Sequence, residues 1–168
     1  MNNDIFKIAF RFVGLLVIQV FVMDQINFLG FINPMIYILF IFLYPFNNNR
    51  LLFLILAFLL GLVMDTFQDT GGAHAAACVT LTIVRPYLLK LVYGESYVMK
   101  NIKVLTTGID RILLFLCLCV IIHHLVFYSM IIFNMSQILE LLQLTLSVGL
   151  ATITVSLTIL LLIKPRRS

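Results

Sequence analysis

The side chains best suited to chemistry gather in one short polar segment that runs from Asp65 to His74. In a continuous helix, the carboxylates of Asp65 and Asp69 would lie on one face, an arrangement that could serve metal or diphosphate chemistry by holding a divalent cation. Gly71 and Gly72 argue against such a helix, because a glycine pair favours a tight turn with positive φ. An enzyme of this kind also needs a second charged cluster to hold its substrate. We therefore expect no enzymatic activity, no metal and no cofactor.

The same segment also suits a structural role, in which it forms a capped turn between two helices. Asp69 or Thr70 could accept amide hydrogen bonds as the N-cap of a helix that starts near residue 73. His74 would then hydrogen-bond to Asp65 or Asp69. We favour this capped hairpin; exchange of both aspartates for asparagine would test the enzymatic alternative.

The remaining candidate metal ligands do not form a recognisable site. His123 and His124 are neighbours, and adjacent residues of a helix point about 100° apart, so the pair cannot easily bind one metal ion. We expect at most one of them to face the protein interior. Cys78, Cys117 and Cys119 lie in apolar runs without Cys-x-x-Cys spacing, a pattern typical of small buried side chains.

The composition requires lipid as the solvent for most of the chain. Of its 168 residues, 62% are hydrophobic and 11% are charged, and the mean hydropathy is +1.14. Soluble proteins are typically about 45–50% apolar and about 25% charged. A soluble domain of this size could not bury so much apolar surface. The net charge of +4 is therefore expected to reflect membrane topology rather than binding to nucleic acid.

The hydropathy pattern predicts an all-α integral membrane protein, organised as a single polytopic domain with a bundle of about six transmembrane helices. Crossing about 30 Å of hydrocarbon takes about 20 helical residues, and short polar segments separate apolar runs of this kind. The predicted spans are residues 5–23, 28–46, 51–64, 73–93, 112–133 and 139–163.

The distribution of charge predicts the orientation of the chain. With six spans, all eleven lysines and arginines fall on one side of the membrane, whereas the other side carries Asp24, Asp65, Asp69 and Glu140. Because cytoplasmic segments collect basic residues, we expect both termini in the cytoplasm. Five or seven spans would break this segregation, which favours six.

The second and fourth predicted spans contain prolines, and the third predicted span is short. Asn33-Pro34 predicts that the second helix starts or bends at Pro34, because proline lacks an amide donor and clashes with the preceding turn. Arg85-Pro86 predicts a kink in the fourth span. We expect Arg85 to reach the inner headgroups as an interfacial anchor, and a buried ion-pair role is the alternative. The short third span could continue through Phe67.

The last span carries small and hydroxyl side chains on two faces, which would let neighbouring helices approach closely. We expect internal packing to use these faces, and a partner interface is the alternative. The faces consist of Ser147, Ala151, Thr154 and Thr158 on one side, and of Thr145, Gly149, Thr152 and Ser156 on the other.

The segment from Gly61 to Pro86 resembles the MreD family of rod shape-determining proteins. The matching runs are Leu60-Gly61-Leu62-Val63-Met64-Asp65-Thr66-Phe67, Asp69-Thr70-Gly71-Gly72-Ala73-His74-Ala75-Ala76 and Arg85-Pro86. Asn33-Pro34 in a short second span also looks like that family, and chain length and span number agree. From these runs we expect the following residues to form a structural or interaction motif: Gly61, Asp65, Asp69, Gly71, Gly72, His74, Arg85 and Pro86.

The resemblance implies a non-enzymatic subunit of the bacterial cell-elongation complex in the inner membrane. Such a subunit binds an MreC-like bitopic membrane protein and acts indirectly with the MreB filament, the RodA glycosyltransferase and a penicillin-binding transpeptidase. It supports peptidoglycan synthesis and the regulation of cell shape. The family is also similar in fold to the substrate-binding subunits of ECF transporters. The alternative function is therefore vitamin transport, with an outer pocket lined by Asp65 and His74.

Overall fold

The computed structural model describes residues 2–26, 32–45, 49–95 and 103–164, and this part of the chain is built from helices. Six are α-helices: α1 (Asn2–Phe21), α2 (Ile38–Leu43), α3 (Arg50–Gln68), α4 (Ala73–Tyr93), α6 (Ile109–Ile132) and α7 (Ile138–Ile163). Three short 3-10 helices lie between them: η1 (Met23–Gln25), η2 (Val104–Thr106) and η3 (Met135–Gln137).

Five helical segments of the described chain are long and apolar enough to cross a membrane: α1 with the turn that follows it, α3, α4, α6 and α7. Their outer surfaces carry large apolar side chains, including Phe10, Leu91 and Leu150, which are 70%, 74% and 63% exposed. In water a surface of this kind would drive association, so lipid must cover it. The chain is thus a multi-pass, all-α membrane protein, as its composition predicts.

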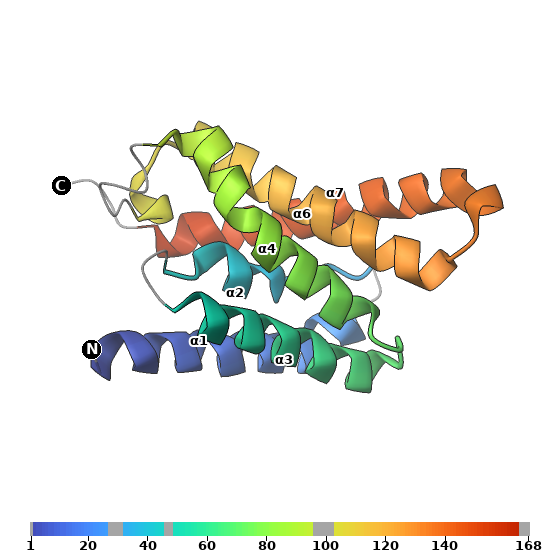
Figure 1. Cartoon of the computed structure of the whole chain (residues 1–168), viewed down its shortest axis with the longest axis horizontal. Coiled ribbons are helices and arrows are strands. Elements are labelled where there is room, and N and C mark those ends of the chain that lie inside the picture. Colours follow the sequence, from blue (N-terminus) through green and yellow to red (C-terminus); the bar gives the residue numbers. More distant parts are fainter. Residues whose placement is uncertain (1, 27–31, 46–48, 96–102, 165–168) are drawn as a thin grey trace.

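The long helices pack so that α4 has α3 on one side and α6 on the other, while α7 packs against α6. Figure 1 shows that α1 begins and α7 ends at the same end of the bundle. The directions of the helices place Arg50, Lys90, Arg111 and Lys164 toward this end and Asp65 toward the other. The segregation of charge along the sequence therefore becomes a segregation between the two ends of the bundle.

The observed helices differ in detail from the predicted spans. The third helix continues past residue 64 and through Phe67, as the alternative for this short span allowed, and ends at Gln68, just before Asp69 with its positive φ. The fourth helix, by contrast, keeps the predicted bounds of residues 73–93, with Pro86 inside it.

The prediction of a transmembrane helix over residues 28–46 is wrong. Within the described residues of this span only α2 is helical, and its six residues are far fewer than the roughly 20 that cross a bilayer. Pro34 explains the loss of helix before α2, since proline has no amide hydrogen and disfavours a helical conformation at Asn33. Because α1 ends and α3 begins at opposite ends of the bundle, residues 32–45 still cross it, as a broken segment (Figure 1).

Candidate functional site

The broken segment lies in the centre of the protein. Every side chain from Met35 to Phe42 is at most 5% exposed. A main chain without complete helical hydrogen bonding is costly in a membrane unless other protein groups bind its amides and carbonyls. The polar side chains of the other helices supply these groups, and the resulting polar core is the candidate functional site.

Gln19 of α1 and Thr152 of α7 bind the non-helical half of the segment. The Gln19 side chain donates from Nε2 to the Pro34 carbonyl at 3.1 Å and accepts from the Tyr37 amide at 3.3 Å. The Met35 amide donates to Thr152 Oγ1 at 3.0 Å. Two helices at opposite ends of the sequence therefore replace the hydrogen bonds that Pro34 prevents a helix from making.

Two arginines bind the carbonyls at the C-terminal end of α2. Arg85 donates through one guanidinium nitrogen to the carbonyls of Phe42 and Tyr44, at 3.2 and 2.6 Å. Arg11 donates to the Leu43 carbonyl at 3.2 Å. The C-terminal end of a helix carries partial negative charge, which favours cations there.

The expectation that Arg85 reaches the headgroups as an anchor is wrong. Its side chain is 3% exposed, and its guanidinium carbon lies 5.4 Å from the centre of the Phe53 ring. The carbonyls of the broken segment and the Phe53 ring hold the guanidinium inside the bundle. The alternative of a buried role is closer to the structure, but the carbonyl partners could not be inferred from the sequence, because they depend on the loss of helical structure next to Pro45.

The Tyr37 hydroxyl joins two buried histidines. It lies 2.6 Å from His74 Nδ1 and 2.9 Å from His123 Nε2. On its other side, His74 Nε2 lies 3.0 Å from Gln68 Oε1, and the Gln68 amide group donates to Asp24 at 3.0 Å. This chain of hydrogen bonds connects the core of the bundle with the turn after α1.

The hydrogen-bond partners determine where the protons lie in this series of hydrogen bonds from Asp24 to His123. The Asp24 carboxylate only accepts, so Gln68 must present its oxygen to His74, and His74 carries its proton on Nε2. Tyr37 then donates to His74 Nδ1 and accepts from His123 Nε2. Every hydrogen bond in the chain thus has one donor and one acceptor with both histidines neutral.

The expected hydrogen bond between His74 and Asp65 is present, but the main-chain amide of His74 makes it and the ring does not. Asp65 thus binds the main chain at the start of α4. Its two carboxylate oxygens accept from the amides of His74 and Ala75, both at 2.9 Å, and from the Thr70 hydroxyl. Asp65 is thus an acidic cap supplied by the preceding helix to the positive end of α4.

The expectation that Asp69 or Thr70 would be the N-cap of this helix is wrong. The residue at that position is Gly72, with φ of 100°, while Asp69 ends α3 with φ of 53°. Gly71 also has positive φ, 59°, so the predicted glycine turn is confirmed. The backbone needs this turn because the first amides of α4 must return to the Asp65 carboxylate, which lies near the end of α3.

Gly61 lets α3 and α4 approach each other one helical turn before Asp65. A Cβ atom at this position would lie 2.5 Å from the Ala75 nitrogen and 2.6 Å from the His74 oxygen. These atoms belong to the main chain of α4 and cannot move aside as a side chain could. Gly61 and Asp65 therefore act on the same helix junction.

The motif residues do not converge on one cavity. Gly61, Asp65, Asp69 and the two glycines form the α3–α4 junction, whereas Arg85 and Pro86 lie about three turns after His74 on α4. The broken segment connects the two groups, since His74 binds Tyr37 and Arg85 binds the carbonyls that follow α2.

Both members of the His123-His124 pair are buried, contrary to the expectation for adjacent helical residues. His124 Nδ1 lies 2.9 Å from the Val120 carbonyl, and its Nε2 lies 3.3 Å from Thr152 Oγ1. The pair can both point inward because α6 lies between α4 and α7 and is enclosed on two sides. In the described residues, no group of three His, Cys, Asp or Glu side chains is placed to hold a metal ion.

The polar core also contains three residues that no sequence motif indicates: Gln19, Tyr37 and Gln68. The available signal was the presence of Gln19 inside an apolar run, because polar residues within a span usually face the protein interior. The partners could not be inferred, since they lie on different helices. The chain matches no protein-family model, no curated protein and no solved structure.

Proposed function

We propose that this protein is a non-enzymatic adaptor of the bacterial cell-elongation complex in the inner membrane, with both termini in the cytoplasm. Its bundle binds an MreC-like bitopic protein in the plane of the membrane. Through that partner it acts with the MreB filament, the RodA glycosyltransferase and the penicillin-binding transpeptidase. The resemblance to the MreD family over Gly61 to Pro86 motivates this proposal.

The hydrogen bonds of the polar core support the role of an adaptor rather than that of an enzyme. Asp65 binds two main-chain amides, His74 binds Tyr37 and Gln68, and His124 binds a main-chain carbonyl. Asp65 thus holds the helix junction and His74 holds the broken segment, whereas His124 bonds to its own helix and to Thr152. The core thus has the character of a rigid support for the outer helix faces.

The observation that carries the proposal is the division of α7 into two faces. Thr145, Gly149, Thr152 and Ser156 face the bundle and are buried. On the other face Thr154 and Thr158 are exposed, and their hydroxyls donate to carbonyls of their own helix at 2.8 and 2.9 Å. A partner helix could approach this outer face closely, because its side chains are small and their polar groups are already bonded.

Co-purification from native membranes tests the proposal. We expect an affinity-tagged chain to recover an MreC-like protein, and we expect depletion of the chain to change cell shape. The variant Ala151→Leu with Thr154→Leu should weaken recovery, because leucine at both positions would keep a partner helix at a distance. Gly14→Leu is the matched control, since a Cβ there meets no atom within 4 Å.

Two results would count against the proposal. One is the absence of an MreC-like protein together with normal cell shape after depletion. The other is loss of the partner with Gly14→Leu but not with the α7 variant, which would place the interface on α1. The vitamin-transport alternative, with its similarity to ECF subunits, rests on the resemblance alone; native mass spectrometry that finds a retained vitamin would support it.

A further inference from the structure

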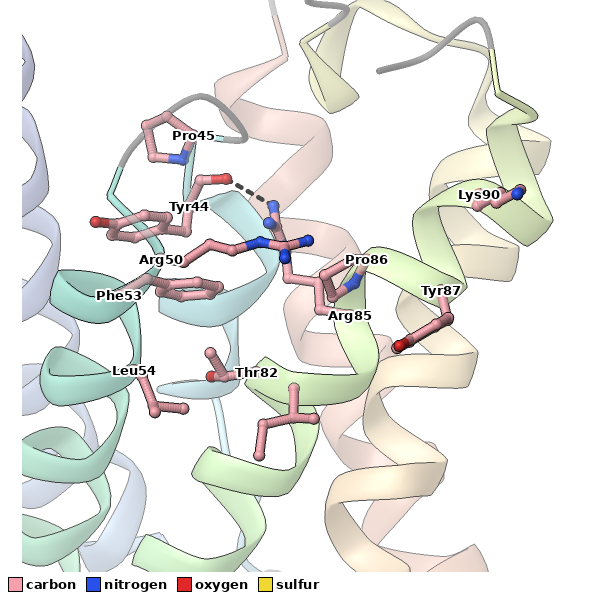
Figure 2. Close-up of a pocket in the computed structure, with 11 residues that line it drawn as sticks. Tyr44, Pro45, Arg50, Phe53, Leu54, Thr82, Arg85, Pro86, Tyr87 and Lys90 are labelled. Carbon is pink, nitrogen blue, oxygen red and sulfur yellow. Dashed lines mark hydrogen bonds between the residues drawn. The ribbon is translucent and has the colours of Figure 1, made fainter.

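A pocket of about 530 Å³ lies between α3 and α4, near the end of the bundle where α3 begins. Figure 2 shows it beside the end of the broken segment, with Tyr44 and Pro45 on one side and α4 on the other. Neither Asp65 nor His74 lines it, so it is separate from the pocket that the transport alternative expects.

Three cationic side chains line this pocket: Arg50, Arg85 and Lys90. Figure 2 shows the Arg50 side chain extending from the start of α3 toward α4. Within the described part of the chain, Arg50 makes no hydrogen bond and no ion pair. The pocket therefore presents at least one guanidinium whose charge is available to an anion.

Lys90 is paired with Glu95 at the surface. The ammonium group lowers the pKa of the Glu95 carboxyl, chiefly through a hydrogen bond and further through its charge. Both side chains are well exposed, at 60% and 77%, and an exposed pair of this kind is weak. An anion entering the pocket can thus compete with Glu95 for Lys90.

Thr82 provides a polar group deeper in the same pocket. Its side chain is 6% exposed, and its hydroxyl has no hydrogen-bond partner among the residues that the structure describes. The carbonyl of Thr82 also lacks its usual helical donor, because the residue four positions later is Pro86. A buried hydroxyl without a partner is unfavourable, and an occupant that offers an acceptor would relieve this cost.

The other walls are apolar and open toward lipid. Leu54, Ile83 and Pro86 line the pocket together with Tyr87. Ile83 and Tyr87 are 57% and 72% exposed on a helix that crosses the membrane. From Lys90 to Thr82 the helix extends about 12 Å, at 1.5 Å per residue. The pocket thus has a cationic rim at one end of a span and an apolar wall that continues into the membrane.

We propose that this pocket binds an anionic phospholipid, with its phosphate at Arg50 and Lys90, an ester oxygen at the Thr82 hydroxyl, and an acyl chain along Leu54 and Ile83. Basic pockets between transmembrane helices favour such headgroups. A free phosphate would use the rim but would leave the apolar wall and Thr82 uncovered. This proposal does not depend on the cell-elongation role.

Native mass spectrometry of the full chain tests it. The protein is exchanged into micelles that contain equal amounts of phosphatidylglycerol and phosphatidylcholine with identical acyl chains. We expect one phosphatidylglycerol to be retained in preference. Arg50→Gln and Lys90→Gln should each weaken its binding by about fivefold, and Thr82→Val should weaken it while Thr82→Ser should not.

Arg111→Gln is the matched control, because it removes a cation at the same end of the bundle without lining the pocket. If Arg50→Gln proves unstable, Arg50→Lys retains the charge and should retain the lipid. Equal retention of the two lipids, or an equal loss with Arg111→Gln, would overturn the proposal. Displacement of the lipid by millimolar inorganic phosphate, with phosphate bound in its place, would identify a free phosphate as the ligand and would also overturn it.

Discussion

His74 and Arg85 lie about three turns apart on α4 and hold the two halves of the same buried segment. His74 binds the Tyr37 hydroxyl just before α2, and Arg85 binds the carbonyls of Phe42 and Tyr44 at its end. Three turns of helix return a side chain to nearly the same face, so one helix can contact both halves. α4 is thus the support on which the broken segment rests.

Tyr37→Phe should destabilise the protein. The change removes the hydroxyl between His74 and His123, leaving one ring nitrogen of each without its partner, at a cost of about 1–3 kcal/mol in the free energy of unfolding. Thermal denaturation in detergent should show a lower midpoint. Tyr87→Phe is the control, because Tyr87 is 72% exposed; equal midpoints for the two variants would contradict a role for the shared hydroxyl.

Gly61→Ala should separate α3 from α4. The added methyl group would meet the main chain of Ala75 and His74, and overpacking of this kind costs about 1–3 kcal/mol. The expected result is a lower yield of folded protein in size-exclusion chromatography. Gly14→Ala adds the same group where nothing lies within 4 Å and should have no such effect. A normal yield for Gly61→Ala would show that the two helices can part without cost.

Asp65→Leu should disturb folding more than Asp24→Leu. Loss of the Asp65 carboxylate leaves the amides of His74 and Ala75 without acceptors, and the main chain of α4 cannot turn them elsewhere. Asp24 accepts from the flexible amide groups of Gln19 and Gln68, which can reorient. Expression and complementation measure the difference. Equal behaviour of the two variants would exclude a special role for the Asp65 cap.

Cysteines introduced at Lys103 and Asp69 should label from opposite sides of the membrane. These residues belong to opposite ends of the bundle, as the directions of α3 and α6 require. An impermeant thiol reagent applied to intact cells should reach only position 69, and permeabilisation should add position 103. Cys78, Cys117 and Cys119 lie within spans, so the unmodified chain provides the background. Labelling of both positions in intact cells would refute the proposed orientation.

Much of the architecture could be predicted from the sequence. Hydropathy identified α3, α4, α6 and α7 to within a few residues at most ends, because a span depends on the summed transfer of its own residues into lipid. The glycine turn at Gly71 and Gly72 was predictable for a similar reason, since positive φ is a local preference. These features need no knowledge of distant residues.

The partners of the polar groups were decided only by the tertiary structure. Met35 and Thr152 are separated by 117 positions along the chain and share one hydrogen bond. The sequence showed that Pro34 would disturb a helix, but not that Gln19, Thr152 and Arg85 would bind the freed main chain. A local pattern records which groups need partners in lipid, whereas the fold alone determines which side chains are near enough to provide them.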